Sequence, residues 1–291
     1  MRHIKPGLCG TLLVASVALL CMQTLAAAQA VWPNEPAGST LITDWSFDTI
    51  SGPLPGPRWR NNGGSIIVSD ATAPLSPTNV LKFPYPVGFL SGYAPDTVYY
   101  PLNNLSEIYF GYWWKASNPW HAHSSLINKI AFQFTDLTGG QLIQIMFGNG
   151  GSEPYRVMSS LEFNGVDNSH LGNGYGDAPG TWQLFGNAST GKVTLGQWHR
   201  IEVYIKKGTS SSSKNGIMRW WVDGILVGNF SNVNYPAEPF IEYQFSPTWG
   251  GAVGARKSED DYYYFDHIRI SQPSGVADVT PPAAPTDLKV N

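Results

Sequence analysis

Two stretches in the second half of the chain decide the fold: GQWHRIEVYIK at Gly196–Lys206 and RWWVDGILVGNF at Arg219–Phe230. The first alternates apolar and polar residues, which is typical of a strand with one buried face. In the second, Asp223-Gly224 supplies the two positive-φ residues of a two-residue hairpin turn. Such a turn pairs the residues on either side of it and would place Arg219 opposite the small Gly228. Both stretches predict antiparallel β-sheet.

The composition points in the same direction. The 291 residues include 31 glycines and 22 prolines, which disfavour a bundle of long helices. Charged residues make up only 13%, whereas aromatic residues reach 13%, enough to form a large core without disorder. The net charge is −3 and no long basic run occurs, so nucleic acid is not an expected partner.

The first thirty residues have the features of a secretory signal peptide. Arg2 and Lys5 give a positive start, Leu8–Leu20 an apolar stretch, and Ala28–Ala30 a small-x-small cleavage site. We therefore expect a secreted or periplasmic protein with no membrane anchor after signal removal. Both cysteines fall within the removed segment, which excludes a disulfide scaffold, a thiolate metal site and cysteine catalysis in the mature protein.

Downstream, residues 31–274 predict one β jelly-roll domain, and residues 275–291 a Pro/Ala-rich extended tail. No stretch shows a helical period over three turns. The expected strands are Leu41–Phe47, Ser65–Ser69, Val80–Phe83, Thr97–Tyr100, Ile108–Lys115, Ile127–Phe134, Leu142–Phe147, Tyr155–Ser159, Ser160–Phe163, Trp182–Phe185, Trp198–Lys206, Ile217–Val222, Ile225–Phe230, Phe240–Phe245 and Tyr262–Ile270.

Polar residues share one register in several of these strands. The alternation groups Lys129 with Gln133, Glu242 with Gln244, Tyr263 with His267, Trp113 with Lys115, and Arg200 with Glu202 and Tyr204. If these strands are neighbours, their polar faces form one surface of aromatic, charged and amide groups, which suits a polysaccharide. An ordinary solvated sheet face is the alternative. The predicted substrate-binding residues are Trp113, Lys115, Trp120, Gln144, Arg200, Glu202, Glu242, Gln244 and Tyr263.

The segment ASNPWHAHSS, residues 116–125, carries Trp120, expected to be exposed, beside His121 and His123. A His-x-His pair can be half of a metal site, but no carboxylate follows until Asp136. Contact with substrate or capping is the favoured role of the two histidines.

Three types of reaction make different demands on the residues of the chain. Glycoside hydrolysis needs two flanking carboxylates, and the strand motif E-x-D-x-x-E is missing, while Asp260 and Asp261 lie in the run KSEDD, which predicts a solvated loop. A serine nucleophile lacks its G-x-S-x-G motif. β-Elimination of a uronate polymer needs a cation or amide for the carbanion and a group that moves protons. The catalytic candidates are His121, His123, Lys129, Gln133, Tyr204 and His267.

The strings GQWHRIEVYIK, MRWWVDGILVG and YYYFDHIRIS resemble the concanavalin A-like lectin/glucanase superfamily, especially its bacterial polysaccharide-lyase-like members. The resemblance covers Gly196–Ser271 well and Leu41–Phe163 loosely. It implies a two-sheet jelly roll whose concave face binds polysaccharide, and a structural Ca²⁺ for which Asp48 and Asp266 are candidates. No other cofactor is required. The chain departs from alginate lyases of this type at Gln144–Met146, where they carry Q-I-H, and lacks their R-x-E-x-R motif.

The sequence therefore predicts an all-β, two-sheet antiparallel jelly-roll sandwich that engages polysaccharide. Two functions remain open, a polysaccharide lyase acting by β-elimination and a glycan-binding module. The alternatives are a glycoside hydrolase of the glucanase type and a structural or adhesive surface protein. The oligomeric state is left open.

Overall fold

The computed structural model describes residues 31–47, 59–75, 79–125, 127–135, 141–149, 152–162, 183–185, 190–210, 213, 215–233, 238–251 and 253–274. The predicted signal peptide and tail lie outside these ranges. Contacts divide the chain into two units, Met1–Glu35 and Pro36–Asn291. In the first, the Glu35 N–H donates to the Trp32 carbonyl at 3.1 Å, closing a turn. No helix among the described residues has the length and apolar character needed to cross a membrane.

The second unit contains two antiparallel sheets. Sheet A has the spatial order β14 (Ile225–Val233), β13 (Gly216–Val222), β12 (His199–Lys206), β6 (Glu107–Ala116), β16 (Asp261–Gln272), β4 (Val80–Tyr85) and β3 (Ile66–Val68), and β1 (Thr40–Trp45) also pairs with β16. Sheet B has the order β10 (Gln183–Phe185), β9 (Ser152–Glu162), β8 (Gln141–Asn149), β7 (Ile127–Thr135), β15 (Phe240–Phe245), β5 (Val98–Leu105) and β2 (Arg60–Asn61), and β11 (Lys192–Val193) pairs with β9.

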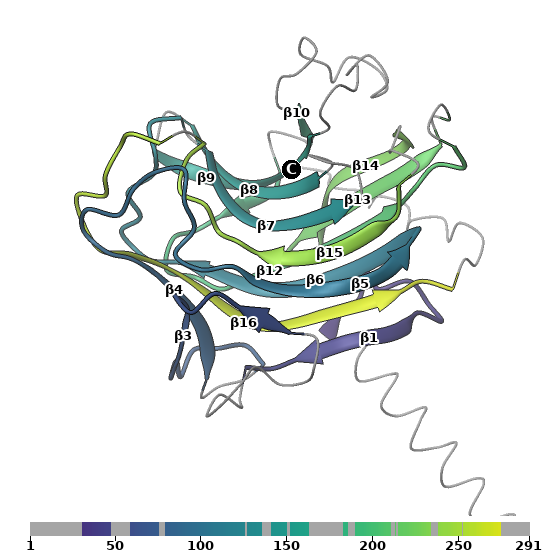
Figure 1. The fold of residues 1–291 in the computed structure, drawn as a ribbon, viewed down its shortest axis with the longest axis horizontal. Helices are drawn as coiled ribbons and strands as arrows, with labels where there is room; N and C mark the ends of the chain where they lie inside the picture. Colours follow the sequence, from purple (N-terminus) through teal and green to yellow (C-terminus); the bar gives the residue numbers. More distant parts are fainter. Residues whose placement is uncertain are drawn as a thin grey trace, which may run out of the picture. The chain divides into compact units, whose positions relative to one another are not determined.

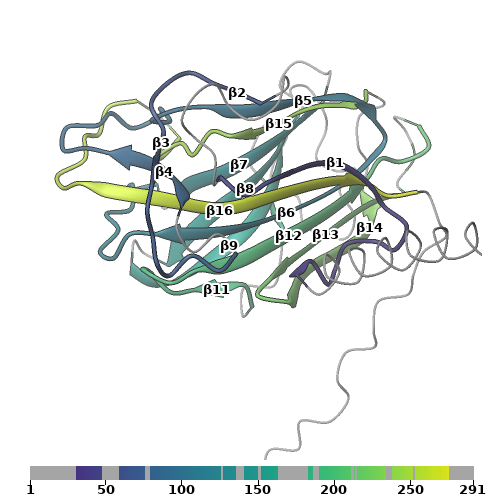
Figure 2. The ribbon, with the colours of Figure 1, turned by 90° about the horizontal axis from the view of Figure 1, so that it is seen from below.

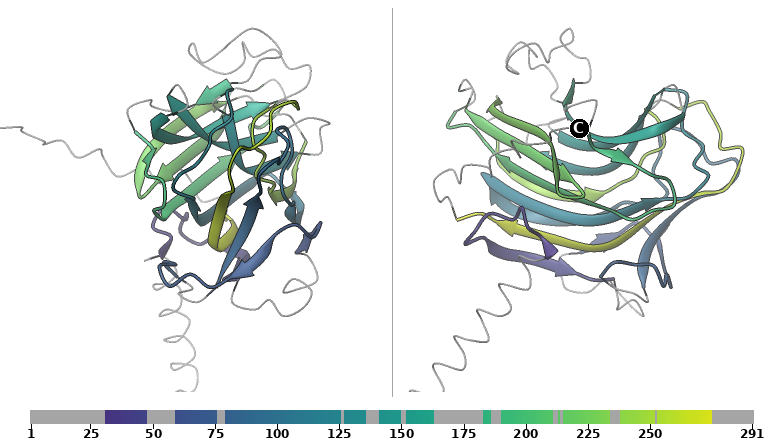
Figure 3. Two further views of the ribbon diagram at one scale, coloured as in Figure 1. Left: turned by 90° about the vertical axis from the view of Figure 1, so that its left-hand side faces the viewer. Right: turned by 180° about the vertical axis from the view of Figure 1, so that it is seen from behind.

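The two sheets lie face to face. Figure 1 shows β7, β8 and β15 of sheet B in the front layer, and the right panel of Figure 3 brings β13 and β14 of sheet A to the viewer. Figure 2 shows the long β16 running between β1 and β6. The predicted two-sheet jelly roll is confirmed.

Aromatic side chains from both sheets fill the space between them. The ring of Phe110 on β6 lies 4.9 Å from that of Tyr243 on β15, and the ring of Phe245 lies 4.2 Å from that of Phe265 on β16. All four side chains are buried in one hydrophobic core. Aromatic rings bury large areas per residue, so a chain without cysteines in its predicted mature part can form a stable sandwich.

Most strands lie within a few residues of their predicted positions. Two predicted strands, Tyr155–Ser159 and Ser160–Phe163, form one continuous strand, β9. The short strands β2 and β11 were not predicted, since two residues are too few to show alternation.

The β13–β14 hairpin turns at Asp223 and Gly224, whose φ angles are 52° and 82°, as the sequence predicts. The predicted partner of Gly228 is wrong, however. The register shifts between Trp220 and Trp221, so Gly228 lies opposite Trp220, and Arg219 instead pairs with Asn229. The extra residue in β14 moves every later partner by one position.

We expect Gly228→Ala to destabilise the fold by about 3 kcal/mol, at the upper end of the effect of overpacking a core. A Cβ at this position would lie 1.9 Å from Cζ3 of Trp220, whose indole is fully buried. Urea unfolding would measure the effect as a lower midpoint at constant slope. Gly251→Ala is the matched control, because its Cβ would meet nothing within 4 Å. Equal midpoints for the two variants would contradict the prediction.

Candidate functional site

The outward face of sheet B carries a row of side chains on four neighbouring strands. Tyr99 on β5 lies opposite Gln244 on β15 and opposite Arg60 on β2, and Gln244 pairs in turn with Phe132 on β7. Directly opposed residues of an antiparallel sheet share a face and have Cβ atoms about 5 Å apart. Tyr243, next to Gln244 in the chain, is buried in the core, so these four residues face away from it. We call Arg60, Tyr99, Gln244 and Phe132 the sheet B row.

A β-bulge in β7 brings Lys129 onto the same face as the sheet B row. The pairing with β8 shifts between Lys129 and Ala131, so Ala131 enters the core while Phe132 lies outside it. The ammonium of Lys129 lies 5.8 Å from the centroid of the Phe132 ring. The rings of Phe132 and Phe134 stack with centroids 5.6 Å apart and planes 8° apart. A cation therefore lies beside a pair of parallel aromatic rings.

The same bulge turns Gln133 inward, so the prediction that Lys129 and Gln133 share a face is wrong. Gln133 is fully buried, and its Nε2 donates to the carbonyls of Phe134 at 3.0 Å and Glu242 at 2.9 Å. It braces β7 against β15 and does not face the outside. On β15, Gln244 Nε2 donates to the carboxylate of Glu242. An amide and a carboxylate are thus joined beside the sheet B row.

The predicted single polar surface is wrong, because its strands are divided between the two sheets. Sheet A holds Trp113, Lys115, Arg200, Glu202, Tyr204, Tyr263, Asp266 and His267. Sheet B holds Lys129, Gln133, Gln144, Glu242 and Gln244. Strand order depends on pairing between distant segments, which alternation within one strand does not encode.

The polar groups on sheet A bond to one another. Glu202 is fully buried and accepts hydrogen bonds from Tyr109 Oη at 2.7 Å and Arg200 Nε at 3.0 Å. The Tyr204 hydroxyl donates to the carboxylate of Glu107. Side chains held in this way stabilise the sheet, since buried charges need such partners.

A second bulge, in β16, changes which of its side chains share a face. His267 has a φ of 61°, and the register with β6 shifts between Asp266 and Ile268. The prediction that Tyr263 shares the polar face is therefore wrong: Tyr263 is fully buried and stacks on Trp120, with centroids 4.2 Å apart. Trp120, expected to be exposed, is only 4% exposed. Both rings are core residues, which argues against contact with substrate.

The three candidate histidines have different partners. His121 Nδ1 lies 3.1 Å from the carboxylate of Asp261, and His123 Nδ1 lies 2.8 Å from Ser125 Oγ. His267 Nε2 contacts the carboxylate of Asp44 on β1. These contacts attach the histidines to three separate segments, and none of them joins a histidine to a tyrosine or to a residue of the sheet B row.

A buried ion pair lies where β16 begins. Lys257 is 2% exposed, and its ammonium donates to the His121 carbonyl at 2.6 Å and pairs with Asp261. It also lies 4.0 Å from the ring centroid of Trp120 and 4.6 Å from that of Trp249. Burial lowers the pKa of Lys257 to about 8, although Asp261 opposes the shift. The prediction that Asp261 lies in a solvated loop is wrong, because its side chain is fully buried.

The predicted calcium pair remains a prediction, because Asp48 lies outside the described residues. Asp266 is buried, and its Oδ2 accepts a hydrogen bond from the Leu75 N–H at 2.7 Å. Among the described residues, no group of three or more histidine, cysteine, aspartate or glutamate side chains gathers where it would hold a metal ion. Gln144 pairs with Ala131 and Ser159 through its backbone, and its side chain is outside the description.

Sequence reasoning missed Arg60 and Tyr99. The predicted strand Thr97–Tyr100 contains two successive tyrosines, and alternation puts one of them outward without saying which. The structure places Tyr100 in the core and Tyr99 outside it. Arg60 lies in a two-residue strand that no periodic signal marks.

The two antiparallel sheets and their strand order define a concanavalin A-like jelly roll. No protein-family model matches the chain, and no curated protein matches its sequence. Solved structures that share the fold include three lyases. The marine PL-14 alginate lyase from Aplysia kurodai is 13% identical with a TM-score of 0.57, covering 80% of this chain and 100% of that one. Alginate lyase vAL-1 from Chlorella virus is 13% identical with a TM-score of 0.56 and the same coverage. The endo-β-1,4-glucuronan lyase from the fungus Trichoderma reesei is 16% identical with a TM-score of 0.54, covering 80% and 96%.

Proposed function

We propose that this protein is a secreted polysaccharide lyase that cleaves a uronate polymer by β-elimination on the outward face of sheet B. The observation that carries the proposal is the sheet B row, which places a guanidinium, a phenol and an amide on three neighbouring strands. Lys129 adds an ammonium on the same face. The fold shared with two alginate lyases and a glucuronan lyase supports the proposal, since alginate and glucuronan are uronate polymers.

Elimination makes two demands on the site. A base removes the proton from C5 of the uronate, the electrons form a C4=C5 double bond, and the C4–O4 bond breaks. The developing negative charge spreads onto the C6 carboxylate, so groups that bind this carboxylate more tightly in the transition state raise the rate. The departing O4 must also receive a proton.

The sheet B row and Lys129 together have groups for both demands. Arg60 and Lys129 supply positive charge and Gln244 an amide donor for the C6 carboxylate. The Tyr99 oxygen accepts the proton from C5 and its hydroxyl proton passes to O4, so no proton is gained or lost overall. The partly exposed ring of Phe134, stacked on the buried ring of Phe132, offers an apolar surface to the C–H face of a pyranose.

The same strands do not favour hydrolysis. Two carboxylates must flank a glycosidic bond that is hydrolysed. In sequence, β2, β5, β7 and β15 together contain a single carboxylate, Glu242, and Gln244 donates a hydrogen bond to it.

The test mixes the purified protein with polymannuronate, polyguluronate, polyglucuronate and polygalacturonate and follows ultraviolet absorbance. Each elimination creates a C=C bond conjugated to the carboxylate, so we expect absorbance to rise on at least one polymer. Retention of the protein on the same immobilised polymers is measured in parallel. Retention without a rise in absorbance would replace the lyase with a glycan-binding module. If the protein gives no rise in absorbance and is not retained on any of the polymers, both functions are overturned.

A further inference from the structure

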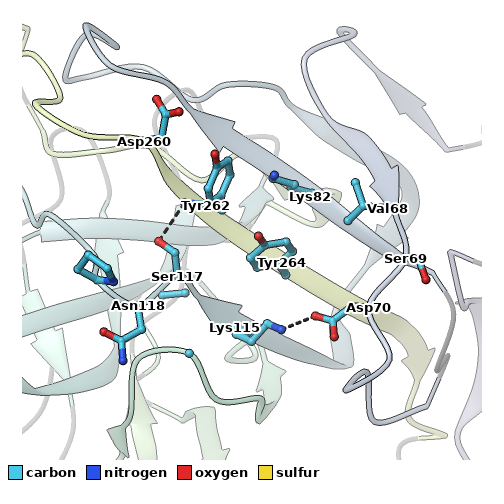
Figure 4. A pocket seen from close by; sticks show the side chains of 13 residues that line it. Val68, Ser69, Asp70, Lys82, Lys115, Ser117, Asn118, Asp260, Tyr262 and Tyr264 are labelled. Atoms are coloured by element: carbon cyan, nitrogen blue, oxygen red, sulfur yellow. Dashed lines mark hydrogen bonds and ion pairs between the residues drawn. The ribbon is translucent and has the colours of Figure 1, made fainter.

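The outward face of sheet A holds a pocket of about 560 Å³ that no step of the proposed function uses (Figure 4). It is lined by Tyr262 and Tyr264 of β16, Lys82 of β4, Lys115 of β6 and the segment 117–119. Its volume is within the range of about 300–1,000 Å³ that small-molecule sites occupy. Because the sheet B row lies on the other sheet, a ligand in this pocket would be separate from the proposed cleavage site.

Lys82 is the distinctive group in the pocket. Its ammonium lies 3.5 Å from the ring centroid of Tyr262 and 5.8 Å from that of Tyr264. Within the part of the chain that the structure describes, its Nζ has no hydrogen-bond acceptor or ion-pair partner. Burial lowers the pKa of Lys82, and the charge of Asp260 partly offsets the shift. A partly desolvated ammonium held on aromatic rings is stabilised when an anion pairs with it.

Lys115, on another side of Tyr264, already has its counter-ion. It is 12% exposed and pairs with Asp70, and its ammonium lies 4.9 Å from the Tyr264 ring centroid. Asp70 also accepts a hydrogen bond from the Thr72 N–H at 2.8 Å, and Trp198 Nε1 donates to Thr72 Oγ1 at 3.1 Å. This side of the pocket is therefore fixed before any ligand arrives, which reduces the entropic cost of binding.

The charges select the ligand. Among the described residues Lys82 has no ion-pair partner within contact distance, so one carboxylate can pair with it, whereas Asp70 and Asp260 at the pocket disfavour a sugar unit that carries more than one negative charge. The phenols of Tyr262 and Tyr264 and the exposed amide of Asn118 are hydrogen-bonding partners for hydroxyl groups. A sugar unit with several hydroxyls and a single carboxylate matches this set.

We propose that the pocket is a second carbohydrate site that binds one uronate unit of an acidic polysaccharide through Lys82. The inference rests on the proposed function only for the identity of the polymer. A polysaccharide held in this pocket keeps the local concentration of substrate high around the protein, while another segment of it, or another polysaccharide chain, is cleaved on sheet B.

The test measures binding of a uronate trisaccharide by titration calorimetry. The protein carries Tyr99→Phe, so that the ligand is not cut, and the trisaccharide comes from the polymer that retains the protein most strongly. We expect two binding events. Lys82→Met should weaken one of them about tenfold or more, the effect of losing a hydrogen-bonded charge pair. Lys206→Met, on the same sheet but paired with Glu107, should leave both events unchanged. A trisaccharide whose carboxyl groups have been reduced should not bind in the pocket.

Thermal unfolding would check that Lys82→Met folds like the parent. Identical binding by the Lys82→Met variant and the parent overturns the second site, whatever the absorbance assay shows. Equal binding of the carboxyl-reduced trisaccharide to the pocket overturns it as well. Lys82-dependent binding in a protein that produces no absorbance rise on any polymer would instead overturn the lyase and leave the second site standing.

Discussion

Replacing Tyr99 with phenylalanine will lower the rate of uronate elimination about 10²- to 10⁴-fold, the range associated with loss of a general acid–base group. The change removes one oxygen from the sheet B row and leaves the ring. Affinity for the polymer should stay within a few-fold, because Arg60, Lys129 and Gln244 still contact the carboxylate. Initial rates of absorbance increase, measured at several polymer concentrations, separate the two effects.

Tyr93→Phe is the matched control for this variant. Tyr93 is 54% exposed in the loop before β5, so the same loss of a hydroxyl occurs at a tyrosine that is not part of the sheet B row. We expect it to keep the parental rate. If the Tyr99→Phe variant keeps the parental elimination rate, Tyr99 takes no part in the mechanism. If its affinity for the polymer falls as much as its elimination rate, Tyr99 acts in binding alone.

The fold was predictable because its signals are local. The Asp223-Gly224 turn needs two positive-φ residues, and the alternation around it needs only neighbouring residues to be read. A run of such strands with little charge and abundant aromatic residues is compatible with few architectures other than a two-sheet sandwich.

The faces of two strands were mispredicted because a β-bulge inserts one residue. After the bulge, every following side chain points to the opposite side. In β7 this exchanged Gln133 for Phe132 on the outward face, and in β16 it separated Tyr263 from His267. His267 adopts a φ of 61° although it is not glycine, so no residue type marks the position of the bulge.

The composition of the site was less predictable than the fold, because it depends on which strands become neighbours. Tyr99 acquires its place beside Gln244 only through pairing of β5 with β15, two segments far apart in the chain. Arg200 and Glu202 show an equally suitable alternation, but they lie on β12, which belongs to sheet A, so they are not part of the site on sheet B. Alternation in the sequence therefore identified polar and aromatic side chains of the expected kinds, but it wrongly assigned side chains of both sheets to one surface.

The ion pair of Lys257 and Asp261 should be the most sensitive point of the fold. We expect Asp261→Asn to lower the free energy of unfolding at pH 7 by about 3–5 kcal/mol, because it leaves a buried ammonium without its counter-ion. The aromatic rings of Trp120 and Trp249 attract the ammonium but do not neutralise it. Urea unfolding measures the change, and Asp260→Asn, next to it in the chain but exposed, should change stability far less.

Adding Lys257→Met to Asp261→Asn should recover part of the loss, since replacing both members of a buried pair is far less damaging than removing one. The pH dependence gives a second readout. Between pH 8 and the unfolded pKa of 10.5, the unfolded chain holds a proton on Lys257 that the native chain has lost, so the contribution of Lys257 to stability should rise with pH, by up to about 3 kcal/mol. Buried tyrosines with raised pKa values lower stability in the same range in both proteins, so the readout is the stability of the parent minus that of the double variant, which should rise with pH. A single Asp261→Asn variant as stable as the parent at pH 7, or a difference between parent and double variant that does not rise with pH, would show that Lys257 is not held as a charged, desolvated group.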